Sequence, residues 1–214
     1  MSIRVLIVDN QAIVRKGLRM YLQTDPELEI VAEVSDGQEA LRASSLLLPD
    51  VILMDLLMPK RDGITAARAI REQLPGMKII ALSSTTDYAL IASAVLAGVS
   101  TYLYKGIKSE QLISIVKGVV AGRVMLLPAL VERLLKALPL PKPILQPLLS
   151  DEIVLLRLLA SQHCDTEIAE QLGVDEATVR SVIERIQTKL AASSRLLAVL
   201  RAMQLGLIER TLVG

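Results

Sequence analysis

The sequence predicts two domains of different class: a doubly wound α/β domain on a five-stranded parallel sheet, and a small all-α domain of four helices. Residues 1–123 alternate short β-branched runs with longer amphipathic stretches, which is typical of βα units around a parallel sheet. Residues 148–214 carry apolar residues only at helical spacing. Residues 124–147 hold one amphipathic helix and a proline-rich linker, where we place the domain boundary.

Five strands and five helices alternate in the first domain. The first, third and fourth strands are apolar throughout, as expected for central strands that are covered on both faces. The predicted strands are Ile3–Val8, Ile30–Val34, Val51–Met54, Lys78–Leu82 and Thr101–Tyr104. The predicted helices are Ala12–Leu22, Gln38–Leu47, Thr65–Gln73, Tyr88–Ala97 and Ser109–Ala121.

The remaining helices follow from apolar spacing and from proline and glycine positions. The stretch PALVERLLKAL, Pro128–Leu138, has helical spacing and a proline suited to a first turn. Prolines at positions 139, 141, 143 and 147 then favour an extended spacer. Gly173 separates the second and third helices of the last domain, an arrangement typical of a helix-turn-helix. We expect the third helix at Glu176–Leu190, with Asp175 as its N-cap.

Composition excludes several classes of protein. The net charge of +1 gives no reason to expect a polyanionic partner, and residues 148–214 alone carry −2. No apolar run is long enough for a membrane span and no signal-peptide pattern is present, so we expect a cytoplasmic protein. Cys164 and His163 are too few to predict a zinc site.

Polar side chains follow four of the predicted strands. Because the carboxyl ends of parallel strands meet at one edge of the sheet, we expect these side chains to converge. Carboxylate oxygens suit Mg²⁺, and a buried carboxylate at Asp55 requires a cationic partner. The pattern therefore predicts a site for phosphate and a cation. The residues concerned are Asp9, Asn10, Asp55, Ser83, Ser84 and Lys105.

The motifs VLIVDN, DLLMPKRDG, ALSS and YLYKG resemble, in order and spacing, the receiver domain of two-component response regulators. The resemblance implies a flavodoxin-like sheet of order 2-1-3-4-5 and phosphorylation of Asp55 by a histidine kinase, with Mg²⁺ as cofactor. It implies the following roles: Asp9, Asn10, Asp55 and the carbonyl of Leu57 hold the metal, Ser83 and Lys105 bind the phosphoryl group, and Ser83 and Tyr102 form a switch.

Asn10 departs from the receiver pattern, which has an acid at this position. An amide oxygen brings no charge, so the affinity for Mg²⁺ should fall. A receiver that is not controlled by phosphorylation therefore remains an alternative. Ser83 capping a helix and Tyr102 filling a sheet edge are the purely structural alternatives for the switch pair.

The stretches LRLLA, EIAEQLGV, ATVR and SSRLLAVLRAMQLGLI resemble the LuxR-type helix-turn-helix, and the two domains together resemble the NarL/FixJ class of response regulators. The resemblance implies a transcription factor, not an enzyme, whose third helix enters the major groove of double-stranded DNA. The expected DNA contacts are Arg180 and Ser181 at base edges and Thr178, Arg185 and Lys189 near phosphates.

Two features complicate this interpretation of the second domain. Glu184 stands where the family usually has a basic residue, so an interaction module that no longer binds DNA is an alternative, although glutamate can accept from cytosine. Ile153 and Val154 make the first helix apolar nearly all round, so a surface must cover it. We expect an isologous homodimer through these residues, the last helix or the Pro128–Leu138 helix.

Overall fold

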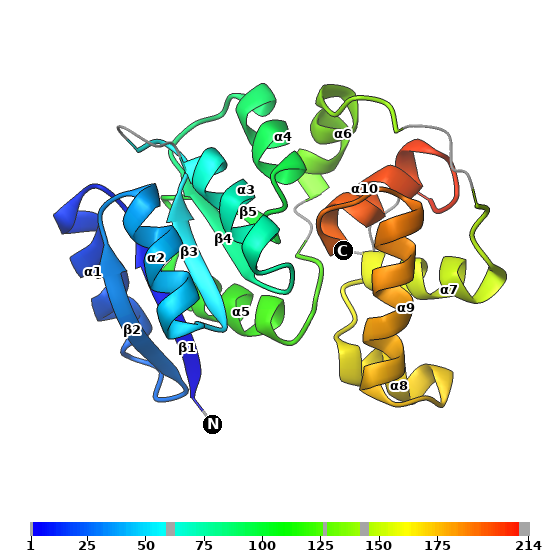
Figure 1. Cartoon of the computed structure of the whole chain (residues 1–214), viewed down its shortest axis with the longest axis horizontal. Helices are drawn as coiled ribbons and strands as arrows, with labels where there is room; N and C mark the ends of the chain where they lie inside the picture. Colours follow the sequence, from blue (N-terminus) through cyan, green and yellow to red (C-terminus); the bar gives the residue numbers. More distant parts are fainter. Residues whose placement is uncertain (1, 59–62, 126–127, 142–145, 210–214) are drawn as a thin grey trace.

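The predicted fold class is confirmed by a computed structural model, which describes residues 2–58, 63–125, 128–141 and 146–209. All strands of its sheet run parallel in the order β2-β1-β3-β4-β5 (Figure 1). Residues 126–127 and 142–145 of the predicted linker lie outside the described part. The strands are β1 Ile3–Val8, β2 Leu28–Val34, β3 Val51–Asp55, β4 Lys78–Ser83 and β5 Thr101–Tyr104.

Helices cover both faces of the sheet, which explains why the central strands are apolar throughout. Successive residues of β1 enter opposite cores: Leu6 and Val8 pack on one face, Val5 and Ile7 on the other. The first core contains residues of α2, α3 and α4, and the second contains residues of α1 and α5. These helices are α1 Ala12–Leu22, α2 Gly37–Leu47, α3 Gly63–Gln73, α4 Tyr88–Leu96 and α5 Ser109–Val120.

The C-terminal part is helical and contains the expected helix-turn-helix pair, α8 and α9. Gly173 ends α8 in the left-handed conformation, at φ 67°, where a glycine costs no strain. The side chain of Asp175 accepts a hydrogen bond from Thr178 N at 2.6 Å, so it caps α9 as predicted. The helices are α6 Pro128–Ala137, α7 Ser150–Ala160, α8 Asp165–Leu172, α9 Glu176–Lys189 and α10 Arg195–Gln204.

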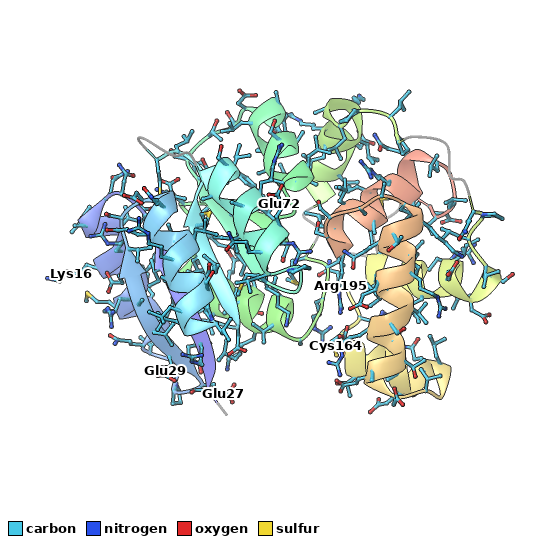
Figure 2. The ribbon with its side chains drawn as sticks, viewed as in Figure 1. Lys16, Glu27, Glu29, Glu72, Cys164 and Arg195 are labelled. Atoms are coloured by element: carbon cyan, nitrogen blue, oxygen red, sulfur yellow. The ribbon has the colours of Figure 1, made fainter. Side chains whose placement is uncertain are left out.

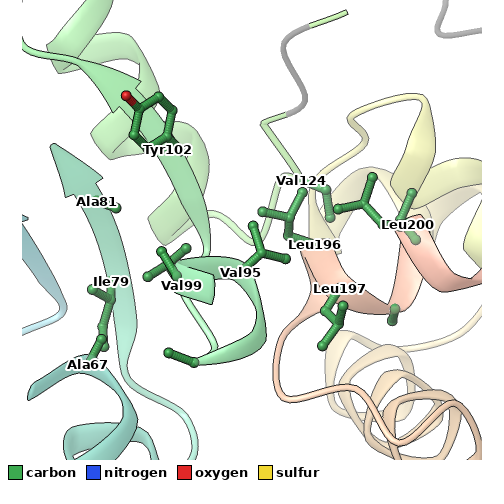
Figure 3. Close-up of a cluster of buried hydrophobic side chains, with 14 of the residues drawn as sticks. Ala67, Ile79, Ala81, Val95, Val99, Tyr102, Val124, Leu196, Leu197 and Leu200 are labelled. Atoms are coloured by element: carbon green, nitrogen blue, oxygen red, sulfur yellow. The ribbon is translucent and has the colours of Figure 1, made fainter. Parts of the chain in front are cut away.

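One apolar core joins the two halves of the chain. Helix α6 packs against both α4 and α10 (Figure 1). Val95 and Val124 of the first half lie beside Leu196, Leu197 and Leu200 of α10 (Figure 3). The apolar side chains of α10, which we expected at a dimer interface, are thus already covered within the chain.

Helix α7 is covered only in part. Ile153 is half-buried against the shared core, whereas Val154 is 40% exposed. The covering surface for Ile153 is therefore supplied by the same chain. Within the described residues, no helix has the length and hydropathy needed to cross a membrane.

Candidate functional site

Three charged residues from three strand ends meet at the carboxyl edge of the sheet. The Nζ atom of Lys105 lies 2.7 Å from Asp9 Oδ2 and 2.9 Å from Asp55 Oδ2. Both carboxylates are almost completely buried, with 1% and 2% of their surface exposed. The ammonium of Lys105 is the cationic partner that a buried strand-end acid requires.

The ion pairs also act on the lysine. Burial lowers the pKa of Lys105, but the hydrogen bonds to Asp55 and Asp9 outweigh burial and leave this pKa raised. A raised lysine pKa means that the pairing stabilises the fold at neutral pH and below, and that this contribution is lost as the pH rises through the raised value.

The backbone around Asp55 fixes the position of its carboxylate. Leu57 N donates to Asp55 Oδ1 at 3.0 Å, and Gly63 N donates to Leu56 O at 3.1 Å. A Cβ atom on Gly63 would lie only 2.0 Å from the carbonyl oxygen of Asp55, so no larger residue fits there without movement of the backbone. The glycine that follows the acid in the sequence thus allows α3 to begin directly against β3.

Ser83 and Tyr102 converge on a third residue, Thr85. Ser83 is fully buried, and its Oγ accepts a hydrogen bond from Thr85 N at 3.3 Å. The hydroxyl of Tyr102 donates to Thr85 O at 2.5 Å, and burial raises the pKa of Tyr102. Both residues predicted as a switch therefore bind the loop that leads into α4.

A further contact carries this connection to α6. Tyr88, the first residue of α4, accepts a hydrogen bond from Arg133 Nη1 at 2.7 Å, and the Arg133 guanidinium lies 4.7 Å from the Tyr88 ring centre. Gln204 Nε2 of α10 in turn donates to Leu135 O of α6 at 3.1 Å. Sequence analysis missed Thr85 and Arg133, because no periodic pattern relates residues in different helices and loops.

The residues predicted to hold Mg²⁺ are only partly acidic. The carboxylates of Asp9 and Asp55 are buried, whereas Asn10 and Leu57 are exposed. The carboxylates of Asp9 and Asp55, the amide of Asn10 and the carbonyl of Leu57 would all offer oxygen atoms, which Mg²⁺ prefers as ligands. Because Asn10 is uncharged, these residues carry one negative charge fewer than they would with an acid at position 10. The described residues contain no group of three or more His, Cys, Asp or Glu side chains that could hold a metal.

The expected DNA-contacting residues of α9 fall into two groups. Thr178, Arg180, Ser181 and Arg185 are exposed, and the guanidinium of Arg180 lies 3.5 Å from Glu176 one turn earlier. Lys189 differs because its side chain is only 16% exposed and its Nζ binds a carboxylate of α7.

Glu152 of α7 is that carboxylate, and sequence analysis missed its role. Its side chain is 1% exposed, 2.8 Å from Lys189 Nζ and 3.7 Å from Arg185 Nε. Burial raises its pKa, but the hydrogen bonds from Lys189 and Leu149 N outweigh burial and leave this pKa lowered. Lys189 therefore holds α7 against α9. The sequence signal for this pair was an acid directly before the apolar run of α7.

The exposed side of α9 borders a cleft between the two halves of the chain, of about 1080 Å³. Arg68, Arg71 and Glu72 of α3 line one wall, and Arg180 and Glu184 of α9 line the other.

Side-chain contacts also cross the junction, where Arg195 lies between the two halves (Figure 2). Arg195 Nη1 donates to Gly122 O at 2.9 Å and pairs with Asp165, and Arg123 binds Glu167 at 2.7 Å. In this arrangement α9 faces the first domain.

Comparison with known families agrees with this architecture. Residues 5–117 match the model of the response regulator receiver domain, and residues 147–202 match that of the luxR family of bacterial regulatory proteins. The chain is a response regulator. It belongs to the class that joins a receiver domain to a LuxR-type domain, whose members are transcription factors and not, in general, enzymes.

Individual relatives match the regulator over nearly its whole length. The transcriptional regulatory protein LnrK of Bacillus subtilis is 34% identical over 95% of this chain and 98% of its own. The response regulator protein VraR of Staphylococcus aureus is 32% identical over 98% of this chain and all of its own. The crystal structure of ChrA, a response regulator of a haem-sensing two-component system, has a TM-score of 0.53 and 32% identity over 97% of this chain and 99% of its own.

Proposed function

We propose that the regulator is a cytoplasmic transcription factor that accepts a phosphoryl group on Asp55 from a histidine kinase and then binds promoter DNA through α9. The observation that carries this proposal is the meeting of Asp9, Asp55 and Lys105 within 2.9 Å at the sheet edge. A carboxylate held beside an ammonium is placed to take up a phosphoryl group, because the ammonium can neutralise the charge that arrives.

The transfer step requires little beyond positioning. An Asp55 carboxylate oxygen forms a bond to phosphorus as the bond from phosphorus to the kinase histidine nitrogen breaks, and the nitrogen keeps that electron pair. Lys105 and the hydroxyl of Ser83 then bind separate phosphoryl oxygens. Asp9, Asn10, Asp55 and Leu57 O would hold Mg²⁺, which when bound neutralises charge on the transferring oxygens.

The output step is the exposure of α9. Ser83 and Tyr102 both bind Thr85, so rearrangement of Ser83 toward a phosphoryl group changes the loop that leads to Tyr88 and Arg133. Helix α6 packs on α4 and α10, so a change in this loop would reach the C-terminal helices through α4 and α6. A homodimer with one α9 in each half-site is the proposed active form.

The exposed amide of Asn10 favours a second candidate, a receiver that works without phosphorylation. Its lower charge weakens the attraction for Mg²⁺, on which phosphoryl transfer depends. In that case another partner would separate α9 from the receiver, while DNA binding would remain.

Intact-protein mass spectrometry after treatment with a small phosphodonor tests the first half of the proposal. With Mg²⁺ present, we expect a gain of one phosphoryl mass, which peptide mapping places on Asp55. The gain should disappear in Asp55→Asn and persist in Asp151→Asn, which alters an exposed acid on α7. Asn10→Asp should lower the Mg²⁺ concentration needed. No gain in the native protein would favour the second candidate.

Duplex binding tests the second half. A DNA-binding regulator must bind duplex DNA with an affinity that falls as salt rises, since bound phosphates release counterions. Absence of duplex binding, both before and after phosphodonor treatment, would favour the interaction module that the −2 charge of residues 148–214 allows.

A further inference from the structure

The solvent-facing side of α9 has an unusual composition. Val179, Ile183 and Ile186 are buried against the rest of the domain, which fixes the opposite side of the helix as the solvent side. Four exposed residues form the centre of that side, which we call the exposed line of α9: Ala177, Ser181, Glu184 and Thr188. Three of them are small, so Glu184 is the side chain that reaches farthest from the middle of this surface.

Glu184 is free of charged partners within the described part of the chain. Arg180 stands one turn before it, but its guanidinium lies near Glu176, at 3.5 Å. Thr188, one turn after it, donates to the backbone carbonyl of Glu184 and not to the carboxylate. The carboxylate therefore has its full hydrogen-bonding capacity available to whatever meets this face.

The spacing of the residues matches groove reading. Helices of the homeodomain type contact bases with residues at positions i, i+3, i+4 and i+7. Ala177, Arg180, Ser181 and Glu184 have this spacing, and all four are exposed. Arg180 and Arg185 flank the central line on opposite sides, and their side chains are 55% and 57% exposed. Arg185 can thus bind a phosphate while Arg180 and the central residues meet base edges.

The hydrogen-bonding properties of a carboxylate determine which base Glu184 can contact. A carboxylate only accepts hydrogen bonds, and it is repelled by phosphates and by the acceptors of guanine and thymine. Adenine offers its N6 amino group beside the N7 acceptor, whereas cytosine offers only the N4 amino group in the major groove. We propose that Glu184 is a specificity-determining residue that accepts a hydrogen bond from cytosine N4, so that each half-site contains an essential C·G pair. This inference rests on the proposed DNA binding.

Site selection with the full-length regulator tests the proposal. A randomised duplex library is selected with phosphodonor-treated native protein, Glu184→Ala and Glu184→Gln. We expect native protein to enrich a C·G pair at one position of each half-site. Glu184→Ala should lose the preference at that position alone, and Glu184→Gln should shift it to A·T, because an amide pairs with adenine N6 and N7. Replacing the C·G pair should weaken native binding about fivefold or more.

Glu170→Gln is the matched control. Glu170 is an exposed acid on α8, outside the α9 surface, so the same change of charge there should alter affinity equally for all sequences. Enrichment of the same base pairs by native protein and Glu184→Ala would overturn the assignment of Glu184. Duplex binding without any enriched sequence would also overturn it, whereas absence of all duplex binding would overturn the proposed function itself.

Discussion

The receiver edge and the exposed side of α9, the two ends of the proposed signal path, are built in opposite ways. At the receiver edge, Asp9, Asp55 and Lys105 are buried and bound to one another. On α9, Ser181 and Glu184 are exposed and their side chains bind none of the described residues. Folding therefore positions the proposed phosphoacceptor site, whereas the side chains of the proposed DNA-reading surface are not held by the fold.

This difference separates effects on stability from effects on function. A change at the receiver edge removes a partner from a buried charge, which costs several kcal/mol. A change at Ser181 or Glu184 removes no side-chain hydrogen bond or ion pair within the described residues. We therefore expect large changes in the free energy of unfolding for substitutions at the receiver edge and small changes for substitutions of Ser181 and Glu184 on α9.

Removal of the central cation should have the largest effect. Lys105→Met leaves Asp9 and Asp55 buried without their ammonium partner. We expect the free energy of unfolding to fall by about 3 kcal/mol, measured by urea denaturation. Adding Asp9→Asn should recover part of the loss, since one uncompensated charge is then gone. An unchanged urea midpoint for Lys105→Met would mean that the pocket is solvated and not fixed by folding.

Gly63→Ala should have the next largest effect. Its Cβ would lie 2.0 Å from a backbone oxygen of Asp55, so the start of α3 must shift at a cost of about 1–3 kcal/mol. Gly17→Ala is the control, because no atom lies within 4 Å of a Cβ at that helical position. The control should raise stability by up to about 1 kcal/mol. Equal effects of the two substitutions on urea unfolding would contradict the close approach of α3 to β3.

The contact between Arg133 and Tyr88 joins α6 to α4, between the receiver edge and the C-terminal helices. Its hydrogen bond and cation–π contact should couple the two residues by about 0.5–1 kcal/mol. A double-mutant cycle of Arg133→Ala and Tyr88→Ala, followed by urea unfolding, measures this coupling. Arg133→Lys keeps a cation near the ring and should retain part of it. Additive effects would show that α4 and α6 are held together by apolar packing alone.

Acid should weaken the start of α8 and its contact with Arg123 by a smaller amount. The hydrogen bonds from Cys164 N and Arg123 lower the pKa of Glu167 from its ordinary 4.5 to about 2. A lowered carboxylate pKa stabilises the fold above pH 4.5, and this stabilisation is lost as the pH falls toward 2. Urea midpoints should therefore fall less between pH 5 and pH 3 in Glu167→Gln than in the native protein. Parallel curves would mean that the carboxylate makes no such contacts in solution.

Substitutions on the exposed line of α9 should have the smallest effect on stability. Ser181→Ala and Glu184→Gln are expected to change the free energy of unfolding by less than about 0.5 kcal/mol. Lys189→Gln should cost more, because it leaves Glu152 buried without its ammonium partner. A large loss for Glu184→Gln would show that Glu184 supports the fold, which would contradict the contrast between the two ends.

Local sequence patterns predicted the elements well but not all of their ends. The apolar run of β3 indicated a buried strand, yet the strand continues through Asp55, which pairs with Leu82. Helix α3 begins at Gly63, two residues before the predicted start. Both differences arise because contacts with neighbouring elements, and not local propensity, decide where an element ends.

The sequence by itself determined the polar residues that close the strands, because parallel strands bring their carboxyl ends to one edge whatever the helices do. It also determined the four helices and the capping of α9 by Asp175. Only the tertiary structure decided that Lys189 binds Glu152 and that α10 packs against α4 and α6. Periodicity shows which face of a helix is apolar, but the partner of that face depends on how distant segments fit together.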